Sequence, residues 1–180
     1  GMSYPMKTRA YADALCGSAP FDDDTNYTTL GLMLIENRGK DFTSDDVMWL
    51  WLSKQPKDAY CTAERVAFRN FIMGYTPHES AIYKNPYREW IGAQIRGDFF
   101  GYVNPGNPVL AAEMAHRDAR ISHVKNGIYG EMFASALIAA AFCEDDMLKV
   151  VKAGLNEIPS TSRLHEELSD LINGYESGLS

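Results

Sequence analysis

The chain has 180 residues, of which 46% are hydrophobic and 23% are charged. This composition is typical of a globular domain large enough to bury one core. The 17 Lys and Arg residues stand against 24 Asp and Glu residues and give a net charge of −7. The acidic balance argues against binding to nucleic acid or to an anionic membrane.

The longest apolar run, Ala134 to Cys143, has about half of the roughly 20 residues that a membrane helix needs. We therefore expect no membrane span. The N-terminal sequence lacks the charged and apolar regions of a secretory signal, and the three cysteines form no C-x-x-C pair. Both features predict a cytoplasmic protein with reduced thiols.

Hydrophobic periodicity is helical in almost every segment, and no alternating stretch is bounded by a hairpin dipeptide. The sequence therefore predicts an all-α fold. No low-complexity linker and no repeat of fixed period interrupts it. We expect an N-terminal segment over residues 1–20 and a single helical domain over residues 21–180.

Cap residues, glycines and prolines set the expected helix ends. In chain order, helices are expected over about 24–38, 44–55, 62–74 and 77–85. A further helix is expected from Tyr87 through Ile95, broken around Gly97 or Gly101 by a loop that runs to Pro108. The later helices are expected over about 108–120, 128–142, 145–156 and 162–173.

Three consecutive carboxylates, Asp22, Asp23 and Asp24, precede Thr25 at the start of an otherwise mostly apolar helix. One interpretation is that they cap the helix and favour its positive end. The other is a hard-cation site, because clustered carboxylate oxygens are the ligands that Mg²⁺ prefers. Adjacent Asp side chains can serve one ion only where the backbone is still in the turn before the helix, and we expect Asp23 and Asp24 to lie there.

Two further segments combine glycines with polar groups. Gly92 permits close approach of the backbone, and Arg96 could pair with a phosphate or with Asp98. Ser122 and His123 interrupt two apolar helices. A lone histidine of this kind is more often a satisfied core residue than a ligand or catalytic group.

Together these segments resemble the ADP-ribosylglycohydrolase family, and they occur in the family's order. The resemblance implies an all-α, compact multi-helix orthogonal bundle. It also implies cleavage of the N- or O-glycosidic bond between ADP-ribose and a protein side chain or small molecule, with two Mg²⁺ ions. The segments that carry the resemblance are Asp22-Asp23-Asp24-Thr25-Asn26-Tyr27, Glu89-Trp90-Ile91-Gly92-Ala93-Gln94-Ile95-Arg96, and Ile121-Ser122-His123 with Gly127-Ile128-Tyr129-Gly130-Glu131-Met132-Phe133.

The resemblance also implies roles for individual residues. Asp22, Asp23 and Asp24 would be metal ligands, with Asp23 and Asp24 at the centre of catalysis by a metal-held water. Substrate would be bound by Gly92, Gln94, Arg96, Ser122, His123 and Tyr129. The expected partner is therefore an ADP-ribosylated protein or a small molecule that contains ADP-ribose.

Two family segments have no counterpart in this sequence: an upstream Gly-Asp-rich helix and a downstream Asp-x-Asp-Thr segment. We therefore expect the second Mg²⁺ site to be incomplete within this chain. Three alternatives stay open: an active hydrolase, an ADP-ribose-binding module without turnover, and a helical module that depends on an oligomer or a complementary chain.

Overall fold

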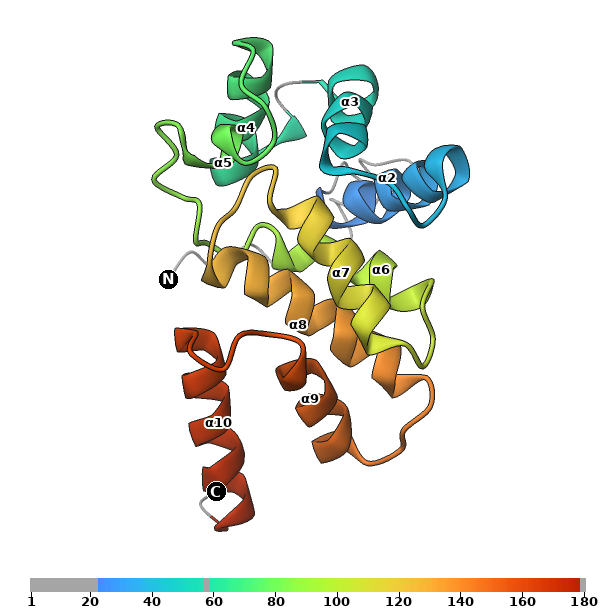
Figure 1. Cartoon of the computed structure of the whole chain (residues 1–180), viewed down its shortest axis with the longest axis vertical. Helices are drawn as coiled ribbons and strands as arrows, with labels where there is room; N and C mark the ends of the chain where they lie inside the picture. Colours follow the sequence, from blue (N-terminus) through green and yellow to red (C-terminus); the bar gives the residue numbers. More distant parts are fainter. Residues whose placement is uncertain (1–22, 57–58, 179–180) are drawn as a thin grey trace, which may run out of the picture.

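The computed structural model describes residues 23–56 and 59–178 (Figure 1). Every regular element in these ranges is helical, which confirms the predicted all-α fold. The expected segment over residues 1–20 lies outside the described residues. The elements are α2 (Asp23–Arg38), α3 (Ser44–Lys54), α4 (Thr62–Ile72), α5 (Glu79–Ile82), η2 (Gln94–Arg96), α6 (Asp98–Tyr102), α7 (Pro108–Ala119), α8 (Asn126–Ala141), α9 (Met147–Asn156) and α10 (Arg163–Glu176).

Side-chain caps fix the starts of several helices. The Thr43 hydroxyl accepts from the backbone N–H of Asp46, and the Asp46 carboxylate accepts from the backbone N–H of Thr43, so the two form a capping box at α3. The Asn107 side chain caps α7 by accepting from the backbone N–H of Leu110, with Pro108 as the first helical residue. These local signals explain why the predicted and observed starts of both helices agree.

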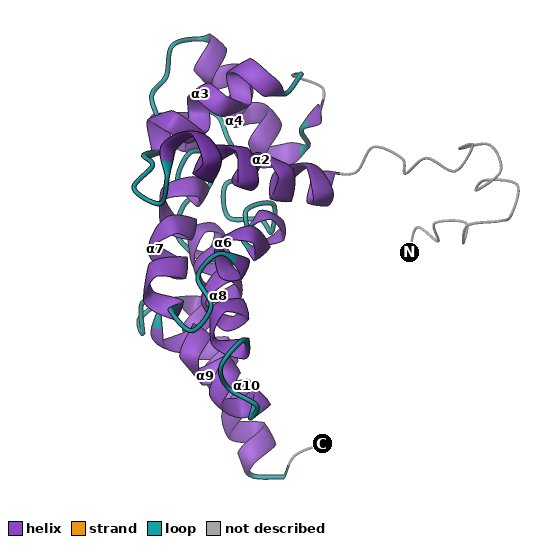
Figure 2. Ribbon diagram, turned by 90° about the vertical axis from the view of Figure 1, so that its right-hand side faces the viewer, coloured by secondary structure: helices purple, strands orange, loops and turns teal. Residues whose placement is uncertain are grey.

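Helix α8 lies at the centre of the molecule and packs against α6, α7 and α9 (Figure 1). Its small residues, such as the fully buried Ala136 and Ala139, allow this close approach. At one end of α8, helices α2, α3 and α4 enclose an aromatic core in which the Trp51 and Tyr60 rings stack with centroids 4.5 Å apart. At the other end, α9 and α10 extend away from that core (Figure 2).

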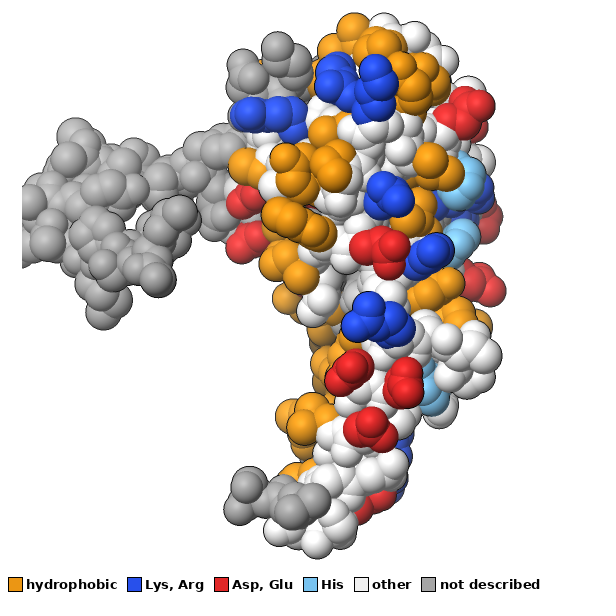
Figure 3. Space-filling view, turned by 90° about the vertical axis from the view of Figure 1, so that its left-hand side faces the viewer, with side chains coloured by type: hydrophobic (Ala, Val, Ile, Leu, Met, Phe, Trp, Pro, Cys, Tyr) orange, Lys and Arg blue, Asp and Glu red, His pale blue; other side chains and the backbone are white. Residues whose placement is uncertain are grey.

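Acidic and basic side chains are both spread along the molecular face shown in Figure 3, among hydrophobic ones. Among the described residues, no helix combines the length and the apolar content that crossing a membrane requires.

The expected helix from Tyr87 through Ile95 is wrong. This segment consists of turns that end in the short helix η2, and α6 begins directly after Gly97. The carbonyl of Arg88 accepts from the backbone N–H of Val124 at 2.9 Å. It therefore bonds to a distant segment and not to an N–H group in the next turn of a helix. Tertiary hydrogen bonding has therefore replaced the helix that local periodicity predicts.

Gly101, where we expected a break, lies inside α6 at its tightest contact with α8. A β-carbon at this position would lie 2.6 Å from Cβ of Ile138 and 2.8 Å from the carbonyl oxygen of Ser135. The absence of a side chain is thus what lets the two helices touch.

Gly101→Ala should therefore lower the free energy of unfolding by about 1–3 kcal/mol, because backbone atoms of α8 cannot yield to the added methyl group. Chemical denaturation would measure the change. Gly174→Ala in α10 is the matched control: a β-carbon there meets nothing within 4 Å, and a gain of up to about 1 kcal/mol is expected. Equal responses of the two variants would contradict the packing argument.

Candidate functional site

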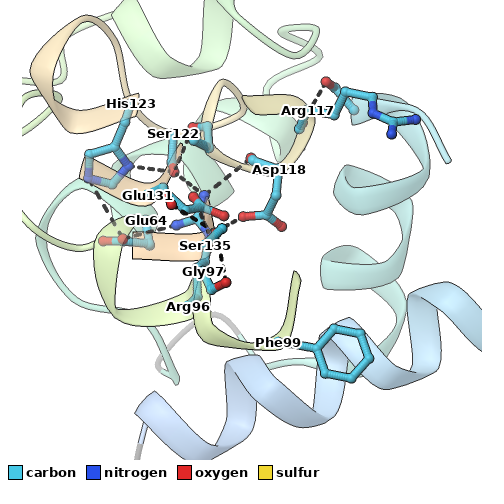
Figure 4. Close-up of polar contacts among 12 residues, drawn as sticks. Glu64, Arg96, Gly97, Phe99, Arg117, Asp118, Ser122, His123, Glu131 and Ser135 are labelled. Atoms are coloured by element: carbon cyan, nitrogen blue, oxygen red, sulfur yellow. Dashed lines mark hydrogen bonds and ion pairs between the residues drawn. The ribbon is translucent and has the colours of Figure 1, made fainter. Parts of the chain in front are cut away.

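Two segments singled out from the sequence, those of Arg96 and of His123, meet around one carboxylate, Glu64, in the first turn of α4 (Figure 4). Glu64 is only 3% exposed. Arg96 and His123 contact its oxygen Oε1, and the backbone at Gly92 lies against it. Burial raises the pKa of Glu64, and the charges of Asp23 and other nearby acids add to the shift, whereas Arg96 opposes it.

The aspartate string is only partly described. Asp22 lies outside the described residues, whereas Asp23 is half-buried and Asp24 is exposed. The expectation that Asp23 and Asp24 precede the helix is wrong, because α2 begins at Asp23, and side chains one residue apart on a helix point about 100° apart. Over residues 23–56 and 59–178, no three His, Cys, Asp or Glu side chains form a group that could hold a metal ion. This part of the chain does not fit a complete Mg²⁺ cage.

Gly92 lies in the turns before η2, and its backbone approaches Glu64 closely. A β-carbon on Gly92 would lie 2.1 Å from Oε1 of Glu64. A side chain here would push this carboxylate away from Arg96 and His123, so the missing side chain at Gly92 leaves room for Glu64. The close approach that the sequence predicted is therefore made to Glu64.

Arg96 is 2% exposed, and all three of its guanidinium nitrogens have partners within the protein (Figure 4). Nε pairs with the carboxylate of Asp118 and lies 3.8 Å from Glu131, and Nη1 lies 3.2 Å from Glu64. Nη2 donates to the Ser122 hydroxyl at 3.0 Å and to the Asp118 carbonyl at 3.2 Å. Four of the five N–H donors of Arg96 are thus used within the protein.

The alternative pairing of Arg96 with Asp98 is wrong. The carboxylate of Asp98 instead accepts from the Thr28 hydroxyl of α2 at 3.0 Å. On its other side, the guanidinium of Arg96 lies over the Trp51 ring, 5.0 Å from the centroid. Arg96 thus joins the aromatic core to the polar site.

One guanidinium faces three carboxyl groups. If all three carboxyl groups were ionised, the cluster would therefore have a net charge of −2. Burying uncompensated charge is costly, and a buried acid responds by keeping its proton. Glu131 is the group best placed to do so: it is completely buried, and neither of its oxygens has a hydrogen-bond partner within the described chain. Burial raises the pKa of Glu131 well above 4.5, the charge of Asp118 adds to the shift, and Arg96 only partly offsets it.

His123 is completely buried beside Ser122, and only one of its ring nitrogens is satisfied. Nδ1 lies 2.8 Å from the Ser122 hydroxyl oxygen. Nε2 has no hydrogen-bond partner within the described chain and lies 3.8 Å from Oε1 of Glu64. Burial lowers the pKa of His123 to about 3, helped by the positive charge of Arg96, so the ring is neutral at physiological pH. The prediction of a satisfied core histidine is therefore only half right.

Two predicted substrate-binding residues lie on the α8 side of the site. Gln94 is exposed at the start of η2, and its Oε1 lies close to Gly130 of α8. Tyr129 is half-buried and packs against apolar clusters that include Ala93 and Leu155. The contacts of Tyr129 are those of a packing residue.

Glu64, Asp118 and Glu131 received no role from the sequence, although two of them left a trace in it. Glu131 is a carboxylate in the otherwise largely apolar helix α8. Glu64 shares a helix face with Phe68 and Phe71, at spacings of four and seven residues, so it lies on the apolar stripe. Nothing local distinguishes Asp118, because its partner Arg96 belongs to a distant segment.

Replacement of Glu131 by Gln, which resembles the protonated acid, should change how stability depends on pH. An acid with a pKa higher in the folded than in the unfolded state stabilises the fold fully below pH 4.5 and loses that contribution as pH rises. Above pH 4.5, the unfolding free energy of Glu131→Gln minus that of the wild type should therefore increase with pH, by up to about 1.4 kcal/mol per pH unit. Urea denaturation at several pH values measures this difference, and the exposed Glu167→Gln is the control. A constant difference between Glu131→Gln and wild type would contradict a proton on Glu131.

The site can be set beside known proteins. A family model described as ADP-ribosylglycohydrolase matches residues 4–178, almost the entire chain. No curated protein and no solved structure matches the chain significantly. The match includes the aspartate string and both segments that meet at Glu64. The chain belongs to the ADP-ribosylglycohydrolase family.

Proposed function

We propose that this chain is a hydrolase that cleaves the glycosidic bond between ADP-ribose and a protein side chain or a small molecule, with the help of Mg²⁺. The observation that carries the proposal is the convergence of Gly92, Arg96 and His123 on Glu64, a carboxyl group that the charge of Asp23 also reaches. These residues come from three segments far apart in the sequence, and the same segments carry the family resemblance.

Hydrolysis breaks the bond between the anomeric carbon and the leaving nitrogen or oxygen. A water oxygen bonds to the carbon and keeps one of its protons, and the other water proton is taken by a base and ends on the leaving group. Asp23 is our candidate for orienting this water. It is half-buried in the first turn of α2, so it is open to solvent, and its charge reaches Glu64. His123 would contact the substrate, whereas Arg96 would act through Ser122 and Glu64, because its nitrogens are already engaged.

Magnesium enters the proposal through the family resemblance. Asp22, Asp23 and Asp24 would supply carboxylate oxygens, and Mg²⁺ commonly binds one or two carboxylates while it keeps several waters. The described residues alone do not form a complete set of ligands for the ion.

Calorimetry of ADP-ribose binding with and without Mg²⁺ tests the proposal. We expect binding that needs Mg²⁺ and that falls at least about tenfold in Asp23→Asn and Asp24→Asn, because each change removes a charged ligand oxygen. Asp45→Asn is the matched control, since Asp45 is an exposed acid in the first turn of α3. If all three variants bound ADP-ribose with the same affinity, Asp23 and Asp24 would not be part of the binding site.

A product assay then separates hydrolysis from binding alone. Release of ADP-ribose from an ADP-ribosylated arginine or serine peptide supports the hydrolase. Binding without release would instead favour an ADP-ribose-binding module. An absence of both would overturn the proposal for this chain as it stands.

A further inference from the structure

Arg96, Ser122 and His123 form a chain of hydrogen bonds that determines where the imidazole carries its proton. We propose that Ser122, oriented by Arg96, is a positioning residue that holds His123 in the tautomer protonated on Nε2. This inference deepens the proposed function. Only the role of His123 toward the substrate rests on that function. The tautomer itself is a property of the free chain.

The first step of the argument concerns the Ser122 hydroxyl. Nη2 of Arg96 lies 3.0 Å from Oγ, and because a guanidinium only donates, Oγ must accept this hydrogen bond. The hydroxyl proton is then left with two acceptors, Nδ1 of His123 at 2.8 Å and the carbonyl oxygen of Ala119 at 3.5 Å. Hydroxyl groups donate over about 2.5–3.0 Å, so the proton points to Nδ1. A neutral ring that accepts at Nδ1 carries its own proton on Nε2.

The second step concerns the opposite side of the ring. Nε2 lies 3.8 Å from Oε1 of Glu64, an oxygen that accepts a hydrogen bond from Nη1 of Arg96 and therefore carries at least a partial negative charge. In the other tautomer, the bare lone pair of Nε2 would face this oxygen, and the two would repel. An N–H group at Nε2 is attracted to it instead. Both sides of the ring thus favour the same tautomer.

The tautomer defines what His123 can do in the site. A protonated Nε2 cannot take a proton from a substrate or a water, so His123 is not a general base at this nitrogen. Because 3.8 Å is too long for a hydrogen bond to Glu64, the N–H at this buried nitrogen has no partner within the described chain. The substrate group that it binds must be an acceptor oxygen.

Two-bond ¹H–¹⁵N correlation spectra of the histidine-labelled chain at neutral pH test the proposal without any ligand. His123→Gln identifies the signals of His123 among those of the four histidines. We expect Nε2 to resonate as a protonated nitrogen and Nδ1 as an unprotonated nitrogen that accepts a hydrogen bond. Ser122→Ala should shift the Nδ1 resonance toward that of an unbonded nitrogen, whereas Ser122→Thr, which keeps the hydroxyl, should not.

Ser135→Ala is the matched control. Ser135 is equally buried, but its hydroxyl donates to the carbonyls of Gly97 and Glu131 and does not touch His123. A proton on Nδ1 in the wild-type chain would overturn the proposal, as would an Nδ1 resonance unchanged by Ser122→Ala. The wild-type spectrum alone decides the tautomer if Ser122→Ala does not fold. Since no ADP-ribose is present, this result is independent of whether the chain binds or hydrolyses it.

Discussion

The buried guanidinium of Arg96 is the interaction on which the arrangement of the site depends. Its partners come from three different helices: Glu64 from α4, Asp118 from α7 and Glu131 from α8. Removing the arginine from such a cluster leaves uncompensated buried charge and typically costs about 3–5 kcal/mol. The ion pairs therefore do more than neutralise charge. They fix the mutual positions of helices that share few other polar contacts.

The same cluster explains why the turns before η2 replace a helix. The backbone at Gly92 passes so close to Glu64 that a β-carbon there would displace the carboxylate, and the Arg88 carbonyl accepts from the segment that carries His123. A helix from Tyr87 would have satisfied local periodicity but could not have met both demands. The site thus determines the local structure here, which is the usual reason for a conflict between propensity and fold.

Features that depend on local sequence could be predicted, whereas features that depend on tertiary contacts could not. Helices α3 and α7 begin where predicted because their caps are local: Thr43 with Asp46, and Asn107 before Pro108. The partners of Arg96 could not be predicted in this way. From the sequence alone Asp98 is a plausible partner, and only the tertiary structure places Asp118 next to Arg96. Of the missed acids, Glu131 was detectable as a carboxylate in an apolar helix, because such a residue needs either a partner or a proton.

Charge alone does not explain why an arginine occupies the centre of the cluster. A well-packed apolar group in place of a buried ion pair is often neutral or stabilising, so stability is a weak reason to keep one. An apolar side chain could not orient the Ser122 hydroxyl, however, and lysine lacks the planar fork that reaches Asp118, Glu64 and Ser122 through separate nitrogens. The guanidinium is the side chain that can join three carboxyl groups and also direct a hydroxyl at Nδ1 of His123. Its value to this fold therefore lies in positioning the histidine, and direct contact of Arg96 with a phosphate is not required for that role.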